Sequence, residues 1–108
     1  MIFVKDDSVK FKRFTNGSLI ILNALMELSK SYAIVITSAN DAKHLSNSKH
    51  YTDQAFDIRS KIFTKQKKAQ FVKDLQVLLG PKFTVLLESI GTDNEHFHVQ
   101  VRKGLNLL

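Results

Sequence analysis

The chain has 108 residues, of which 44% are hydrophobic and 24% charged, and it contains no cysteine. This length and composition predict a single globular domain, residues 1–108, and the lack of cysteine excludes a disulfide scaffold, a thiolate zinc finger and a cysteine nucleophile. Sixteen Lys and Arg residues against ten Asp and Glu residues give a net charge of +6, which favours acidic partners such as nucleic acid or anionic cell-wall polymers.

The start of the chain, residues 1–7, is too short and too acidic for a signal peptide. No apolar run approaches the ~20 residues that a membrane-spanning helix needs. We therefore expect a protein that is made in the cytoplasm, does not span a membrane and is a monomer.

The first half of the chain predicts one helix and one strand. Residues 1–15 form either a strand or an irregular lead-in. A turn at residues 16–18 precedes a helix that ends near Lys30, with Ser18 as its capping residue and with an apolar stripe of Ile21, Leu22, Leu25 and Leu28. Residues 32–37 are rich in β-branched side chains and predict a buried strand, followed by a polar loop over residues 38–51.

The second half predicts three further strands and a second helix. Residues 54–59 alternate between apolar and polar, and Thr64 is a plausible N-cap for a helix that stops at Gly80-Pro81. Residues 83–87 and 95–102 predict strands separated by a turn at residues 91–94. The expected fold is α+β, a mostly antiparallel sheet with two helices packed on one side.

The alternation places several chemistry-bearing side chains together. If Phe97, Val99 and Val101 face the core, His96 and His98 share the opposite face, and the same argument turns Asp57 outward on its own strand. His50 lies on the loop just before Asp57. Two imidazoles and one carboxylate are the ligand set of a catalytic zinc site, although exposed histidines on a strand also occur without any metal.

Two segments resemble the signatures of a known family. Residues 48–57, Ser-Lys-His-Tyr-Thr-Asp-Gln-Ala-Phe-Asp, are similar to the Ser-x-His-x-x-Gly-x-Ala-x-Asp motif of the zinc D-alanyl-D-alanine carboxypeptidases. Residues 95–99, Glu-His-Phe-His-Val, resemble the second motif of that family. The family includes cell-wall peptidases and phage endolysins and has the hedgehog/DD-peptidase fold. The resemblance extends over residues 18–102.

The resemblance implies a mechanism. His50, Asp57 and His98 would bind Zn²⁺, whose bound water would attack a peptide bond of peptidoglycan stem peptides or cross-links. Glu95 would be the general base, and His96 would contact the substrate or the tetrahedral intermediate. Because ideal strand geometry turns Glu95 away from both histidines, Glu88 is the alternative base. Without a signal peptide, such an enzyme would reach the cell wall after release from a phage-infected host.

The sequence departs from the family pattern at two places. Asp53 stands where the family has glycine, and the arginine expected after residues 32–37 is missing. Lys43, His44 or Arg59 could replace this arginine, and Arg59 shares a strand face with Asp57. These departures leave open a non-catalytic module that binds cell wall or a partner through the same fold.

A third hypothesis rests on charge. The cations between residues 59 and 73 follow one another with no acidic residue among them: Arg59, Lys61, Lys65, Lys67, Lys68 and Lys73. They could bind nucleic acid, although no exposed aromatic residues are expected among them, or anionic cell-wall polymers, or simply form a solvated helix face.

Overall fold

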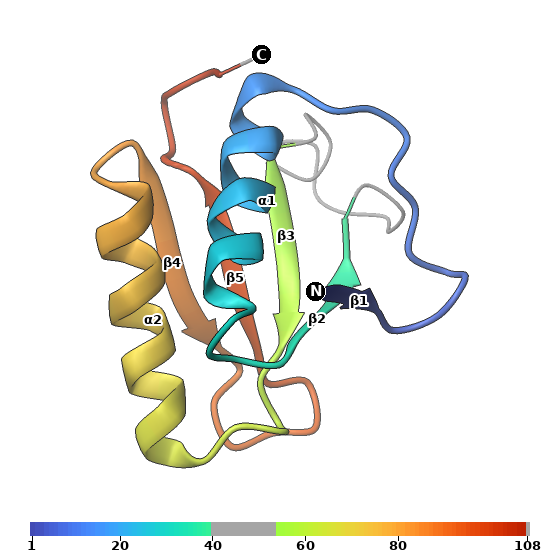
Figure 1. Cartoon of the computed structure of the whole chain (residues 1–108), viewed down its shortest axis with the longest axis vertical. Helices are drawn as coiled ribbons and strands as arrows, with labels where there is room; N and C mark the ends of the chain where they lie inside the picture. The colour runs from blue at the N-terminus through green and yellow to red at the C-terminus, as the bar shows by residue number, and fades with distance from the viewer. Residues whose placement is uncertain (40–53, 108) are drawn as a thin grey trace.

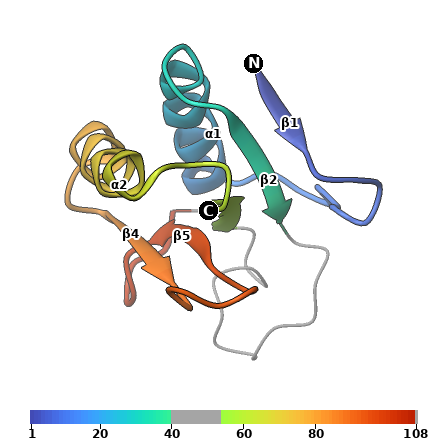
Figure 2. The same ribbon diagram turned by 90° about the horizontal axis from the view of Figure 1, so that it is seen from below.

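The computed structural model describes residues 1–39 and 54–107. Within these residues the elements in chain order are β1 (Ile2–Val4), α1 (Asn16–Leu28), β2 (Ile34–Ser38), β3 (Ala55–Arg59), α2 (Lys65–Leu79), β4 (Phe83–Glu88) and β5 (His96–Val101). The strands form one sheet in the order β1-β2-β3-β5-β4. Both helices lie on the same side of this sheet (Figures 1 and 2). The expected α+β fold with two helices is confirmed.

The sheet is mixed. β1 runs parallel to β2, whereas β2 with β3, β3 with β5, and β4 with β5 are antiparallel pairs. The strand β1 is short, and the backbone of Lys5 continues its pairing by donating to the carbonyl oxygen of Ile36 at 3.0 Å. The first residues of the chain thus form a parallel edge strand, which is followed by the irregular segment that precedes α1.

The first helix begins earlier than the sequence predicted. Thr15, not Ser18, is the N-cap: its hydroxyl oxygen accepts from the Ser18 backbone N–H, and the Ser18 hydroxyl oxygen accepts from the Thr15 N–H. Ser18 therefore completes a reciprocal capping box from the third helical position, where Glu or Gln is more usual. The prediction of Thr64 as the N-cap of α2 is confirmed.

The hydrophobic core lies between the helices and one face of the sheet. Inward-facing side chains of the three central strands pack against apolar residues of both helices. The largest fully buried side chains from strands and helices together include Ile21, Leu25, Ile34, Ile36, Ile58, Phe71, Leu75, Phe97 and Val99. Because side chains alternate along a strand, the residues between these positions face the opposite side of the sheet, which neither helix covers.

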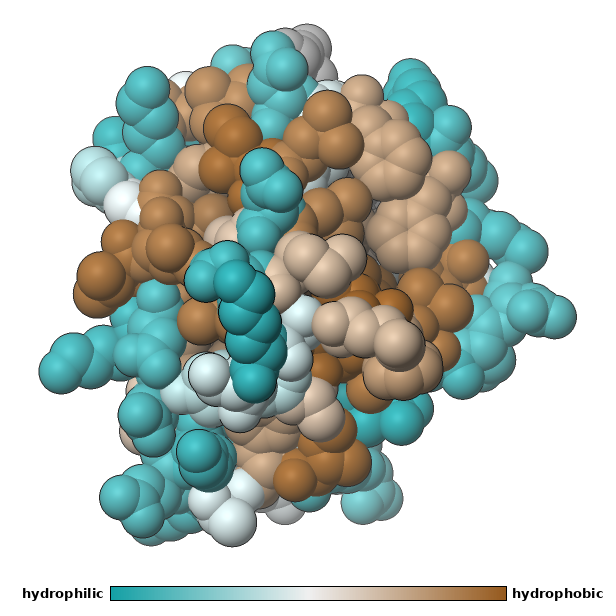
Figure 3. Space-filling model, viewed as in Figure 1, coloured by the Kyte–Doolittle hydropathy of each residue, from teal (hydrophilic) through white to brown (hydrophobic). Residues whose placement is uncertain are grey.

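The helix side of the molecule exposes apolar residues among charged ones (Figure 3), including Leu19 and Met26 on α1 and Val77 on α2. Neither described helix has the length and apolar character needed to cross a bilayer. His96 and His98 of β5 lie on the other face of the sheet.

Candidate metal centre

Asp57 and His98 are direct partners in the antiparallel register of β3 with β5. The Oδ1 atom of Asp57 lies 2.8 Å from Nδ1 of His98 and 3.8 Å from Nε2 of His96. The burial of β5 alternates strictly, with Phe97, Val99 and Val101 buried and the histidines between them only partly so. The predicted outward orientation of both histidines and of Asp57 is confirmed.

These three side chains could hold a metal ion. One donor atom from each of Asp57, His96 and His98 lies within 4.8 Å of the others. Tetrahedral zinc, with bonds of ~2.0–2.2 Å to nitrogen and oxygen, separates its donor atoms by about 3.4 Å. The two separations measured from Asp57 Oδ1, 2.8 and 3.8 Å, bracket this value. Small side-chain rotations would therefore bring this group to the spacing that zinc requires.

Outer hydrogen bonds orient both imidazoles. The Nε2 atom of His98 lies 2.8 Å from the amide oxygen of Gln100, whose NH₂ group donates to the Val101 carbonyl oxygen at 3.2 Å. The Nδ1 atom of His96 lies 2.6 Å from the carbonyl oxygen of Asn94. When each ring donates its N–H to that oxygen, the other ring nitrogen is left with a lone pair directed at the cluster, the arrangement that histidine ligands of metals usually show.

The cluster is partly shielded from solvent. The side chains of Asp57, His96 and His98 are 16%, 23% and 12% exposed. Burial alone would lower the pKa of His98, but hydrogen bonds to Asp57 and Gln100 and the charges of Asp57 and Glu88 outweigh it and raise the pKa above the ordinary 6.5. Without a metal, His98 is thus stabilised as a cation between two oxygen acceptors.

Glu88 lies beside the cluster. It ends β4, and the β4–β5 register places it opposite His96. Its Oε1 atom is 3.1 Å from His96 Nε2 and 4.0 Å from His98 Nδ1. With 42% of its side chain exposed, this carboxylate faces both the cluster and solvent.

Glu95 has a different environment. It lies in the turn just before β5, and its Oε2 atom accepts from Ser60 Oγ at 2.8 Å and forms an ion pair with Lys68 of α2. Hydrogen bonds from Lys68 and Ser60 lower its pKa, and only 7% of the side chain is exposed. The Glu95 carboxylate thus forms a structural contact between the turn and α2.

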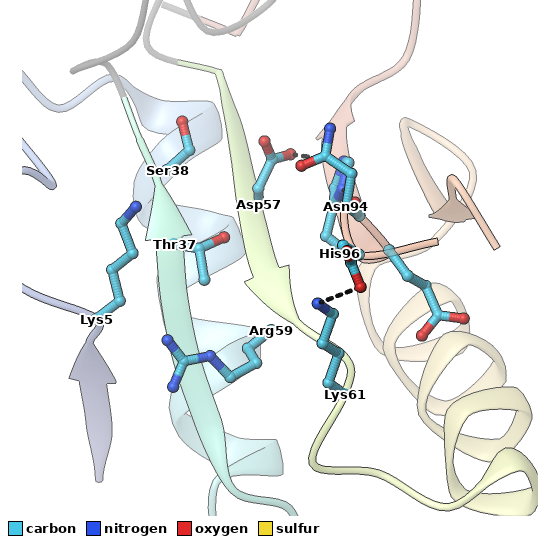
Figure 4. Close-up of a pocket in the computed structure, with 10 residues that line it drawn as sticks. Lys5, Thr37, Ser38, Asp57, Arg59, Lys61, Asn94 and His96 are labelled. Atoms are coloured by element: carbon cyan, nitrogen blue, oxygen red, sulfur yellow. Dashed lines mark hydrogen bonds and ion pairs between the residues drawn. The ribbon is translucent and has the colours of Figure 1, made fainter. Parts of the chain in front are cut away.

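An open groove of about 600 Å³ runs over this face of the sheet (Figure 4). Asp57 and His96 line one part of it, and Thr37 and Ser38 of β2 line another. Arg59 also lines the groove, as predicted from its strand face, but its side chain extends across β2 in Figure 4 and not toward Asp57. Lys5 is a lining residue that the sequence did not indicate, because its place depends on the parallel pairing of β1.

Several predicted residues lie outside the described part of the chain. They are the third zinc ligand His50, the two candidate replacements for the family arginine, Lys43 and His44, and Asp53 of the first motif. Gln100 was not predicted as a site residue. The period of two along β5 places it on the face of His98, but this pattern alone does not indicate that it contacts the imidazole.

Parts of the predicted basic run have structural partners. Lys68 pairs with Glu95, the Lys67 ammonium lies 5.4 Å from the centre of the Tyr32 ring, and Lys61 lies 3.9 Å from Asp93. These cations are therefore distributed over different contacts of the fold.

No protein-family model and no curated protein matches this chain. The case for a function therefore rests on the geometry of this site and on the residues that form it.

Proposed function

We propose that the protein is a zinc-dependent peptidase with the hedgehog/DD-peptidase fold, acting on peptide bonds of peptidoglycan stem peptides or their cross-links. The observation that carries the proposal is the convergence of Asp57, His96 and His98 from two paired strands, with each ring oriented by an outer oxygen acceptor. The motif resemblance adds His50 as a ligand beside Asp57 and His98.

The metal and the protein would divide the chemistry between them. Zinc, when bound, acidifies a water molecule and polarises a carbonyl group. Asp57 and His98 would hold the ion, and His96 would bind it or contact the substrate. We assign the general base to Glu88, since its carboxylate lies 3.1 Å from His96 and that of Glu95 is engaged by Lys68 and Ser60. Glu88 would accept a proton and return it to the leaving amine.

The decisive experiment measures metal content by mass spectrometry on protein purified without a histidine tag. We expect one zinc per chain in the wild type and loss of zinc in Asp57→Ala and in His98→Ala. Asp93→Ala is the matched control, because this exposed carboxylate lies in the neighbouring turn and outside the cluster. A wild type that binds no zinc after zinc is supplied under non-chelating conditions would contradict the proposal.

A second function has one specific observation in its favour. The ion pair of Glu95 with Lys68 removes the carboxylate that the family motif would use as base. This favours a module on the same fold that binds zinc and cell wall without hydrolysing it. Digestion of purified peptidoglycan by the zinc-loaded protein, followed by mass spectrometry of the released peptides, separates the two functions. Retention on peptidoglycan with no released product supports the module.

A further inference from the structure

The groove has a cationic side opposite the cluster of Asp57, His96 and His98. Lys5, which directly follows β1, and Arg59, on β3, both line it. In Figure 4 the Lys5 side chain lies beside β2, near Thr37, and the Arg59 side chain crosses β2. Asp57 and His96 lie across the groove from them. The two walls of one groove therefore differ in chemistry: one carries metal-ligand donors, and the other carries two cations.

These two cations have no close carboxylate in the described residues. The ion pairs found there join other groups, and neither Lys5 nor Arg59 lies within 4.0 Å of a carboxylate oxygen. Asp6 is close enough for both charges to lower its pKa slightly, but hydrogen bonds from Ser8 have the larger effect, and its Oδ1 atom is occupied by the Ser8 N–H and hydroxyl.

The other acidic residues that line the groove are also engaged. Asp93 lies near Lys61, Glu95 pairs with Lys68, and Asp57 accepts from His98. Among the described residues that line the groove, no carboxylate forms an ion pair with Lys5 or Arg59. A guanidinium binds a carboxylate through two parallel hydrogen bonds, and a nearby ammonium adds a third charged donor.

A neighbouring hydroxyl is also short of a partner. The Ser38 Oγ atom is buried and has no hydrogen-bond partner among the described residues, and Ser38 lines this same side of the groove. Thr37 contributes a second hydroxyl there. A buried polar atom without a hydrogen-bond partner is rare in folded proteins, and a bound water or ion is one way in which such an atom is satisfied.

We infer that the β2 side of the groove is a carboxylate-binding subsite. In this subsite Lys5 and Arg59 hold a carboxylate of the peptide that is cleaved at the proposed zinc centre. This inference rests on the proposed function and deepens it, because it makes the substrate an anionic peptide. Lys5 thereby supplies a positive charge to a site whose sequence lacks the expected arginine.

The test compares N-acetyl-D-alanyl-D-alanine with its C-terminal amide as ligands of the full chain. Binding is measured by NMR titration at low ionic strength, both with zinc and after chelation, and zinc content is measured in parallel. We expect the free acid to bind at least about tenfold more tightly than the amide, as one charge-assisted hydrogen-bond pair provides. Lys5→Gln and Arg59→Gln should each remove most of this preference.

Two further variants keep the result interpretable. Arg59→Lys retains the charge and should recover part of the preference, and Lys82→Gln removes an exposed cation outside the groove and should change nothing. Equal binding of acid and amide, no binding of either, or a preference that survives both Gln substitutions would overturn the inference. A chain that binds no zinc but shows the preference, and loses it in the variants, would refute the peptidase and support the subsite.

Discussion

The Asp57 carboxylate lies 2.8 Å from the His98 imidazole because the two residues are opposite each other in the β3–β5 ladder. The pair therefore depends on the register of two strands separated by a helix and a further strand along the chain. A shift of one residue in that register would turn one member of the pair into the core. The Asp57–His98 pair can thus form only when β3 and β5 pair in this register.

The metal-free protein should show a pH-dependent contribution from this pair. The folded-state pKa of His98 is raised, so the stabilisation is fully present below the unfolded pKa of about 6.5 and is lost as pH rises through the folded pKa. Asp57→Asn should therefore reduce the free energy of unfolding more at about pH 5 than at about pH 9. Urea unfolding at both pH values measures this, with an NMR titration of His98 to verify its pKa. An equal loss at both values would contradict the assignment.

Gln100 should affect zinc binding without being a ligand. Its amide oxygen holds the Nε2 side of His98, which leaves Nδ1 for the ion. Removal of such an outer partner typically weakens metal affinity by about 10–100-fold, and we expect this loss in Gln100→Ala. Competition with a chromogenic chelator gives the affinity. Gln70→Ala, on the exposed side of α2, is the control and should keep wild-type affinity.

Substitution of Glu88 should affect catalysis, and substitution of Glu95 should affect stability. Glu95→Gln should lower the melting temperature, because it weakens the contacts of this nearly buried carboxylate with Lys68 and Ser60. Glu88→Gln should change the melting temperature little, since the side chain is 42% exposed, but should lower peptidoglycan hydrolysis by about 10²–10⁴-fold.

The opposite result for the two variants would identify Glu95 as the general base. In that case Glu95→Gln would abolish hydrolysis at temperatures where the protein remains folded, and Glu88→Gln would hydrolyse peptidoglycan at the wild-type rate. Circular dichroism of each variant at the assay temperature establishes that it is folded.

Gly17 should tolerate no side chain. A Cβ atom there would lie 2.6 Å from Val101 Cγ2 and 3.3 Å from Leu107 Cβ, and the Gly17 N–H donates to the Leu107 carbonyl oxygen. Gly17→Ala should therefore lower the free energy of unfolding by about 1–3 kcal/mol, despite the better helix propensity of alanine. Denaturant unfolding measures the loss.

Two variants test the cause of that loss. Val101→Ala removes the clashing methyl groups, so the penalty of Gly17→Ala should shrink in its presence. Asn23→Ala, on the exposed side of the same helix, should be close to neutral. An additive double mutant would indicate that the clash with Val101 is not the cause.

Local sequence patterns were sufficient to predict much of this fold. The period of two in residues 96–101 predicted which side chains enter the core, because a strand alternates its faces whatever its neighbours are. The apolar stripe of residues 71–79 and the Thr64 cap predicted α2, because both depend only on residues within a few turns of one another. The α+β class and the shared orientation of Asp57, His96 and His98 follow from such local signals.

Tertiary structure decided which of these side chains meet. The parallel pairing of β1 brings Lys5 to the groove, the β4–β5 register brings Glu88 to His96, and α2 brings Lys68 to Glu95. The contacts of Lys5 and Lys68 join segments that are far apart in the sequence, and the Glu88–His96 pair, eight residues apart, depends on the register of a hairpin. The sequence alone therefore determined the residues with metal-binding chemistry and the face they occupy. Strand register and helix packing decided which carboxylate lies beside the histidines, because these depend on contacts between separate elements, which the periodicity of one element does not indicate.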